Sequence, residues 1–217
     1  MRVLDRLFRR SKADQPFGSA DYWRARYADG GNSGSGSYGR LADYKAQVIN
    51  ALVETRKIGS VIEFGSGDGN QCSLLTVSNY TGVDISELVV RACRSRFADR
   101  GTWTFLTAEE YRAAPAKAEL AMSLDVIYHL VEDQVFDGYM RTLFAASSRF
   151  VLIYSSDHES GTNADHVRHR AYSDWIRLHA PGFSLVESFA QPFPMLPGSD
   201  KRNTSFAAFK LFESVAG

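Results

Sequence analysis

The stretch Glu63-Phe64-Gly65-Ser66-Gly67-Asp68-Gly69 decides the fold, because three alternating glycines separate a short β-type run from a helical segment. A ligand that lies across such a turn needs main chain without Cβ atoms. A carboxylate just before the turn can accept hydrogen bonds from hydroxyl or cationic groups. The stretch therefore predicts a nucleotide-type site where the strand ends, and a tight turn that binds nothing is the alternative.

The spacing of the glycines separates two kinds of cofactor site. A dinucleotide site has the pattern G-x-G-x-x-G, so that a helix N-terminus can receive the pyrophosphate, whereas here the third glycine comes one residue early. The stretch resembles the first motif of class I S-adenosylmethionine-dependent methyltransferases, which is an acidic residue followed by G-x-G-x-G. The resemblance implies that S-adenosylmethionine is bound by Glu63, Gly65, Ser66 and Gly67.

The resemblance continues through residues 61–154. Val83-Asp84-Ile85-Ser86 ends the second β-type run with an acid, which in that family binds the ribose hydroxyls, so we expect Asp84 and Ile85 at the cofactor. An NAD enzyme can also place an acid there. Glu109 follows the third run, where the family commonly contacts the adenine amino group, although a carboxylate at a helix N-terminus is the alternative. Residues 123–130 look like the fourth motif of small-molecule methyltransferases, which places Asp125 at the cofactor.

The hydrophobic pattern predicts an α/β fold. Five short β-type runs, at residues 61–64, 80–83, 103–106, 120–124 and 150–154, alternate with helical stretches at 70–75, 87–97, 109–113 and 135–146. Such alternation predicts a parallel sheet covered on both faces, with ligand at the carboxyl ends of the strands. A helix at 172–179 precedes runs at 183–189 and 204–212, which should pair antiparallel. We expect a three-layer, Rossmann-like methyltransferase sandwich with a mostly parallel seven-stranded sheet.

The N-terminal part should be a cap on one domain. Residues 1–18 are expected to form a flexible basic leader, with a weak membrane-surface or partner-binding helix as the alternative. Residues 19–217 should form a single domain, in which residues 19–57 make a helical, glycine-rich cap. Glycine-dense residues 30–39 lie between two helical segments, a place where such loops often serve as lids. The cap is similar to that of a bacterial subgroup of the family, and we expect Tyr38 and Arg40 to contact the cofactor.

Composition argues against several classes of function. Lys plus Arg and Asp plus Glu both total 25, so no basic field attracts nucleic acid. No apolar run approaches the ~20 residues of a membrane helix. Two cysteines are too few for a disulfide framework or a zinc site, so we expect a cytoplasmic protein without a metal. The chain lacks the Asn-Pro-Pro-aromatic, Asp-Pro-Pro-aromatic and Pro-Cys signatures of DNA methyltransferases. The oligomeric state is left open.

Candidate residues for the chemistry follow the fourth and fifth β-type runs. A hydroxyl acceptor must lose a proton, and three histidines are candidates for the base: His129, His158 and His166. The alternatives are that His129 caps or packs against the start of a helix and that His158 belongs to an exposed polar loop. Two stretches supply candidates for acceptor binding. The fourth-motif stretch contributes Tyr128, and a dense cationic cluster contributes Arg168, His169 and Arg170. A solvated helix start explains the arginines equally well.

The sequence therefore predicts an S-adenosylmethionine-dependent methyltransferase that releases S-adenosylhomocysteine. We expect a small-molecule or sugar/glycan acceptor, with transfer to oxygen favoured over nitrogen. Two other functions stay open: a binding module that holds S-adenosylmethionine without turnover, and a nicotinamide-dependent reductase. The early third glycine disfavours the reductase.

Overall fold

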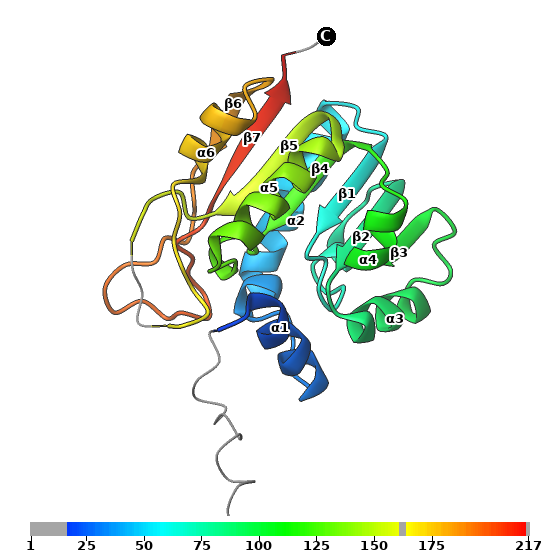
Figure 1. Cartoon of the computed structure of the whole chain (residues 1–217), viewed down its shortest axis with the longest axis horizontal. Helices are drawn as coiled ribbons and strands as arrows, with labels where there is room; N and C mark the ends of the chain where they lie inside the picture. Colours follow the sequence, from blue (N-terminus) through cyan, green and yellow to red (C-terminus); the bar gives the residue numbers. More distant parts are fainter. Residues whose placement is uncertain (1–16, 161–163, 216–217) are drawn as a thin grey trace, which may run out of the picture.

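The computed structural model describes residues 17–160 and 164–215, and these form one seven-stranded sheet with the order β3-β2-β1-β4-β5-β7-β6 (Figure 1). The expected leader at residues 1–18 lies almost wholly outside the described residues. The strands are β1 (Ser60–Phe64), β2 (Asn79–Asp84), β3 (Trp103–Thr107), β4 (Ala118–Leu124), β5 (Ser147–Ser155), β6 (Phe183–Phe189) and β7 (Ala208–Ser214). Strands β1 to β5 pair in parallel, while β7 is antiparallel to both β5 and β6. The predicted fold class, including the antiparallel C-terminal pair, is confirmed.

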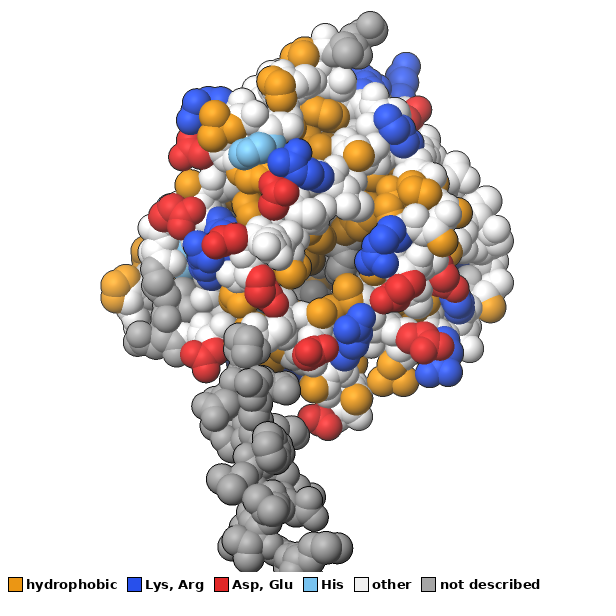
Figure 2. All heavy atoms as spheres, in the orientation of Figure 1, with side chains coloured by type: hydrophobic (Ala, Val, Ile, Leu, Met, Phe, Trp, Pro, Cys, Tyr) orange, Lys and Arg blue, Asp and Glu red, His pale blue; other side chains and the backbone are white. Residues whose placement is uncertain are grey.

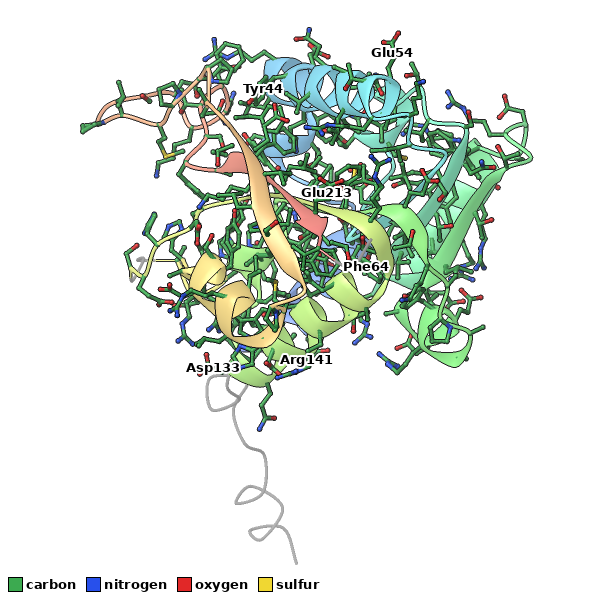
Figure 3. All side chains as sticks on the ribbon, turned by 90° about the horizontal axis from the view of Figure 1, so that it is seen from above. Tyr44, Glu54, Phe64, Asp133, Arg141 and Glu213 are labelled. Atoms are coloured by element: carbon green, nitrogen blue, oxygen red, sulfur yellow. The ribbon has the colours of Figure 1, made fainter. Side chains whose placement is uncertain are left out.

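Helices cover both faces of the sheet. They are α1 (Ser19–Ala28), α2 (Gly39–Thr55), α3 (Glu87–Arg96), α4 (Ala108–Ala113), α5 (Asp133–Ala145) and α6 (Tyr172–His179). Figure 3 shows Tyr44 and Glu54 of α2 on one side of the sheet, and Asp133 and Arg141 of α5 on the other. Each helix described here is too short or too polar to cross a lipid bilayer.

The central strands alternate between two hydrophobic clusters because successive side chains of a strand point to opposite faces. Leu120 and Met122 of β4 pack in the cluster that includes Ile49 of α2. Ala121, between them, joins the opposite cluster with Met140 of α5. Both faces of β4 are therefore buried, and its polar residues, Glu119 and Ser123, come near its two ends.

Two predicted elements differ in extent. The helix expected at residues 70–75 is only the 3₁₀ turn η4 (Cys72–Leu74), because Leu75 and Val77 leave the helical path to fill the core. Strand β7 begins later than expected. The backbone of Ser205 bonds instead to Phe193 and Met195, which ties the proline-rich loop at residues 191–198 to the segment before β7.

Candidate active site

A cavity opens under α1 at the carboxyl ends of β1, β2 and β4. Four of the predicted cofactor residues line it: Gly65, Asp84, Ile85 and Asp125. Figure 2 shows this face hollowed and bordered by hydrophobic side chains. The cavity holds about 180 Å³, less than the ~300–1,000 Å³ usual for small-molecule sites. A nucleoside-sized ligand would extend beyond this volume.

The glycine turn forms one wall of this cavity. Gly65 and Gly67 have φ of 82° and 59°, in the left-handed region that favours glycine. A Cβ on Gly65 would lie 2.4 Å from a methyl of Val126. The Asp84 carboxylate accepts hydrogen bonds from the backbone N–H groups of Gly67 and Ser86, both at 2.9 Å. These contacts lock the turn to the end of β2.

Asp84 keeps capacity for a ligand. Its side chain is buried, and burial raises the pKa of the carboxyl, although backbone N–H groups oppose that shift. A carboxylate offers about four acceptor positions, so hydroxyl groups in the cavity can still donate to it. Apolar Ile85 and Val126 also line the cavity and can flank a flat ring there.

Other predicted cofactor residues lie away from the cavity surface. Glu63 is buried below the turn, where its carboxylate accepts a hydrogen bond from the Tyr80 hydroxyl at 2.5 Å. Burial raises the pKa of Glu63 to about 7, with Tyr80 and Lys45 opposing. Ser66 is buried without lining the cavity. The Glu109 carboxylate lies 3.6 Å from a guanidinium nitrogen of Arg24 and is mostly exposed.

The glycine-rich segment packs on the turn after β1. The backbone N–H of Ser33 and the hydroxyl of Tyr38 both donate to Asp68 Oδ2 at 2.8 Å. Arg40 donates to the carbonyl of Asn203. Tyr38 and Arg40 therefore fasten the cap to the domain in this conformation, while Trp23 and Tyr27 of α1 face the cavity. That the segment acts as a lid stays a prediction.

Asp125 is the junction of three segments. It has φ of 59°, unusual for a residue with a side chain. Its Oδ2 accepts from Lys45 Nζ at 2.5 Å, and its Oδ1 from the Tyr128 hydroxyl at 2.8 Å. A Cβ on Gly36 would lie 2.7 Å from Oδ2, so the glycine-rich segment also rests against this carboxylate.

The sequence analysis did not identify Lys45, although its position on a helix indicates a buried ion pair. Its side chain is fully buried. It lies four residues from both Leu41 and Ile49, which places it on the apolar face of α2. A lysine on such a face needs a buried anionic partner.

His129 occupies the position expected of a base. Its Nδ1 lies 2.8 Å from the carbonyl oxygen of His166. Because a carbonyl can only accept, Nδ1 carries the proton and Nε2 holds the lone pair. The ring lines the cavity, with the Trp23 ring 4.9 Å away between centroids. Burial lowers the pKa of His129 to about 4, so the ring is neutral at physiological pH.

The other two candidate bases contact the site differently. The His166 ring stacks between Tyr22 of α1, at 4.8 Å, and His129, at 5.6 Å, and its carbonyl rather than its ring orients His129. His158 is exposed, with its ring 4.8 Å from that of His169. His169 is buried and lies 2.7 Å from Ser156 Oγ through Nδ1.

The two arginines of the cationic cluster point to the start of α5. Arg168 and Arg170 both contact Asp133 Oδ1, at 2.9 and 2.6 Å. Both also donate to the carbonyl of Val131. These contacts hold the segment between β5 and α6 against α5, and neither guanidinium lines the cavity.

Comparison with known proteins agrees with this geometry. A family described as a methyltransferase domain matches residues 62–144, which include the glycine turn, Asp84, Asp125 and His129. Residues 62–144 are therefore similar to a methyltransferase domain. No curated protein sequence matches the chain significantly.

Solved structures of methyltransferases share the fold of this domain. Magnesium protoporphyrin IX methyltransferase from Synechocystis PCC 6803, with bound S-adenosylmethionine, is 14% identical with a TM-score of 0.63, over 91% of this chain and 98% of that one. The N-methyltransferase NodS from Bradyrhizobium japonicum WM9, with S-adenosylhomocysteine, is 11% identical with a TM-score of 0.62, over 80% and 87%. An O-methyltransferase family protein from Burkholderia thailandensis is 12% identical with a TM-score of 0.59, over 82% and 57%. At these identities the likeness shows the fold.

The Synechocystis structure contains S-adenosylmethionine, and the residues that line the cavity here have the chemistry that such a ligand needs. The buried Asp84 carboxylate suits ribose hydroxyls, and the apolar walls suit the adenine ring. The glycine turn has no Cβ atoms to block the main chain from a ligand, and packing against Val126 also requires glycine at position 65.

Proposed function

We propose that the protein transfers a methyl group from S-adenosylmethionine to a small-molecule or sugar/glycan acceptor, with a hydroxyl oxygen favoured over nitrogen. One observation carries the preference for a hydroxyl: His129 is a neutral imidazole on the cavity wall, with its tautomer fixed by the His166 carbonyl. An imidazole with a free Nε2 can take a proton from a hydroxyl held in the cavity.

The residues around the cavity have separate tasks in this proposal. Asp84 and the glycine turn hold the nucleoside, and Asp125 contacts the remainder of the cofactor. When bound, S-adenosylmethionine supplies an electrophilic methyl group on its sulfonium. Trp23 and α1 exclude water from the reacting groups. His129 receives the proton from the acceptor hydroxyl.

The protonation state of His129 limits how it can act. A pKa of about 4 keeps Nε2 available at neutral pH, but it also makes the imidazole a weak base. Such a base suits a hydroxyl that loses its proton as the methyl group arrives, because the acidity of the hydroxyl rises during transfer. Orientation of the acceptor therefore contributes more than base strength.

Cofactor binding is tested by calorimetry with S-adenosylmethionine, S-adenosylhomocysteine and NAD. Loss of a hydrogen bond to a charged group costs ~1.5–3 kcal/mol, so Asp84→Ala should weaken S-adenosylhomocysteine binding by about tenfold to a hundredfold. Asp99→Ala removes an exposed carboxylate and serves as the control. Unchanged affinity in a folded Asp84→Ala protein, or preference for NAD, would count against the assignment.

Transfer is tested by screening small-molecule and sugar extracts with radiolabelled cofactor. His129→Ala should lower turnover while S-adenosylhomocysteine affinity stays unchanged, and His179→Ala, at an exposed histidine of α6, is the control. If His129→Ala keeps full turnover from pH 6 to 9, His158 or His166 becomes the better candidate. Cofactor binding without transfer to any fraction would indicate the binding module instead.

A further inference from the structure

A strip of aromatic rings runs from the cofactor cavity to the protein surface. Centroids of successive rings are 4.5 Å apart for His129 and Tyr128, 4.9 Å for Tyr128 and Phe206, 4.7 Å for Phe206 and His169, and 4.8 Å for His169 and His158. The rings come from η5 (Ile127–His129), from the segment after β5 and from the loop before β7. All three segments meet at the carboxyl edge of the sheet.

Phe206 is the exposed apolar member of this strip. Its relative exposure is 39%, while Tyr128 and His169 are 9% exposed and support it. Both contact it in T-shaped geometry, at interplanar angles of 75° and 90°. A single exposed apolar side chain is ordinary. Continuity with the cavity, through Tyr128 and His129, distinguishes Phe206 from the scattered apolar residues elsewhere on the surface.

The strip and its flanks favour an uncharged ligand. Burial and the neighbouring His158 lower the pKa of His169, so its ring is neutral at physiological pH. Arg168 and Arg170, which flank His169, are engaged by Asp133 and are directed to α5. An anionic acceptor on the strip would therefore lie beside cations that are already paired.

Two hydrogen-bonding groups in the middle of the strip are already engaged. The Tyr128 hydroxyl donates to Asp125, and Ser156 Oγ bonds to His169. A sugar presents several hydroxyls, each of which loses water on binding and needs a new partner. An aromatic ring needs a flat or edge contact instead, which Phe206 provides.

We propose that this strip is the acceptor platform, that Phe206 packs against the acceptor ring, and that the acceptor is an uncharged aromatic compound bearing a hydroxyl. The inference rests on the proposed function, because the platform leads to the same cavity and to His129. The Tyr128 ring contacts both Phe206 and His129, which joins the platform to the cavity end of the strip.

Binding to the protein saturated with S-adenosylhomocysteine tests the platform without requiring turnover. Three probes are titrated by calorimetry: catechol, its carboxylated analogue 3,4-dihydroxybenzoate, and methyl α-glucoside. We expect catechol to bind most tightly. Phe206→Leu keeps apolar bulk but removes the ring, and should raise the Kd for catechol about threefold to tenfold. Leu178→Ala, at an exposed apolar residue of α6, should leave the Kd unchanged.

The outcomes separate this inference from the proposed function. S-adenosylhomocysteine affinity equal to wild type shows that Phe206→Leu is folded. Tighter binding of the carboxylate or the glucoside, no catechol binding at millimolar concentration, or an unchanged Kd in Phe206→Leu would each overturn the platform alone. Failure of the wild-type protein to bind S-adenosylhomocysteine would overturn both.

Discussion

Replacing Lys45 by methionine should destabilise the protein strongly, because it removes the cation that faces Asp125. The Lys45 side chain is fully buried and that of Asp125 is 14% exposed, with 2.5 Å between Nζ and Oδ2. Methionine has similar length and is apolar, so the packing of α2 is retained. The variant therefore leaves a nearly buried carboxylate without its cation.

The size of the effect follows from the environment of Asp125. Removing one partner of a buried ion pair costs ~3–5 kcal/mol. Asp125 keeps the Tyr128 hydroxyl bond and some contact with solvent, so we expect a loss of about 3 kcal/mol in the free energy of unfolding. For a chain of this length that loss lowers Tm by about 6–12 °C.

Urea unfolding at neutral pH measures this loss, with Lys117→Met as the exposed control. Asp125→Asn should also be destabilising, because it leaves Lys45 buried with a weaker partner. The double variant Lys45→Met/Asp125→Asn should lose less than the sum of the single variants, with a coupling of at least ~1.5 kcal/mol. A Lys45→Met protein within 1 kcal/mol of wild type, or additive losses, would refute the reasoning.

Two further predictions concern the cap and His129. Amide hydrogen exchange in residues 22–40 should slow when S-adenosylhomocysteine binds, because this segment must reclose over the ligand; equal exchange with and without ligand would argue against a lid. The unfolded chain protonates its histidines near pH 6.5, whereas folded His129 does so near pH 4, so acidification across this window should cost up to about 3 kcal/mol of stability. The stability of His129→Phe should fall less than that of wild type between pH 7 and pH 5, measured by urea unfolding, and identical slopes would show that His129 does not titrate as described.

Local patterns predicted most elements of this protein and the edge at which the glycine turn and Asp84 meet. Alternating glycines after a buried β-type run predicted the turn, and the acid after the next run predicted that Asp84 lies at the end of a strand. Both signals come from adjacent residues. Parallel pairing then brought them to one edge of the sheet. The position of β7 between β5 and β6 has no such local signal, and the missing helix between the last two runs predicted only that they pair antiparallel.

Side-chain partners far apart in the sequence escaped prediction. Lys45 and Asp125 are separated by 80 residues, and nothing near either position names the other. Arg168 and Arg170 were expected to bind an acceptor, but Asp133 at the start of α5 engages both. For Phe206, the sequence showed only an apolar residue after a proline-rich loop. The role proposed for it depends on contacts with rings that are distant in the sequence.

The left-handed backbone of Asp125 affects how related sequences should be compared. Only glycine, asparagine and aspartate adopt this conformation readily. The backbone conformation alone therefore favours an aspartate or asparagine at this position, whatever reaction the protein catalyses. Presence of Asp or Asn there is consequently weak evidence of a shared reaction. The partner is more informative: homologues with Asn at position 125 should have lost the lysine at position 45, and covariation of the two positions would trace where the charge itself has been kept.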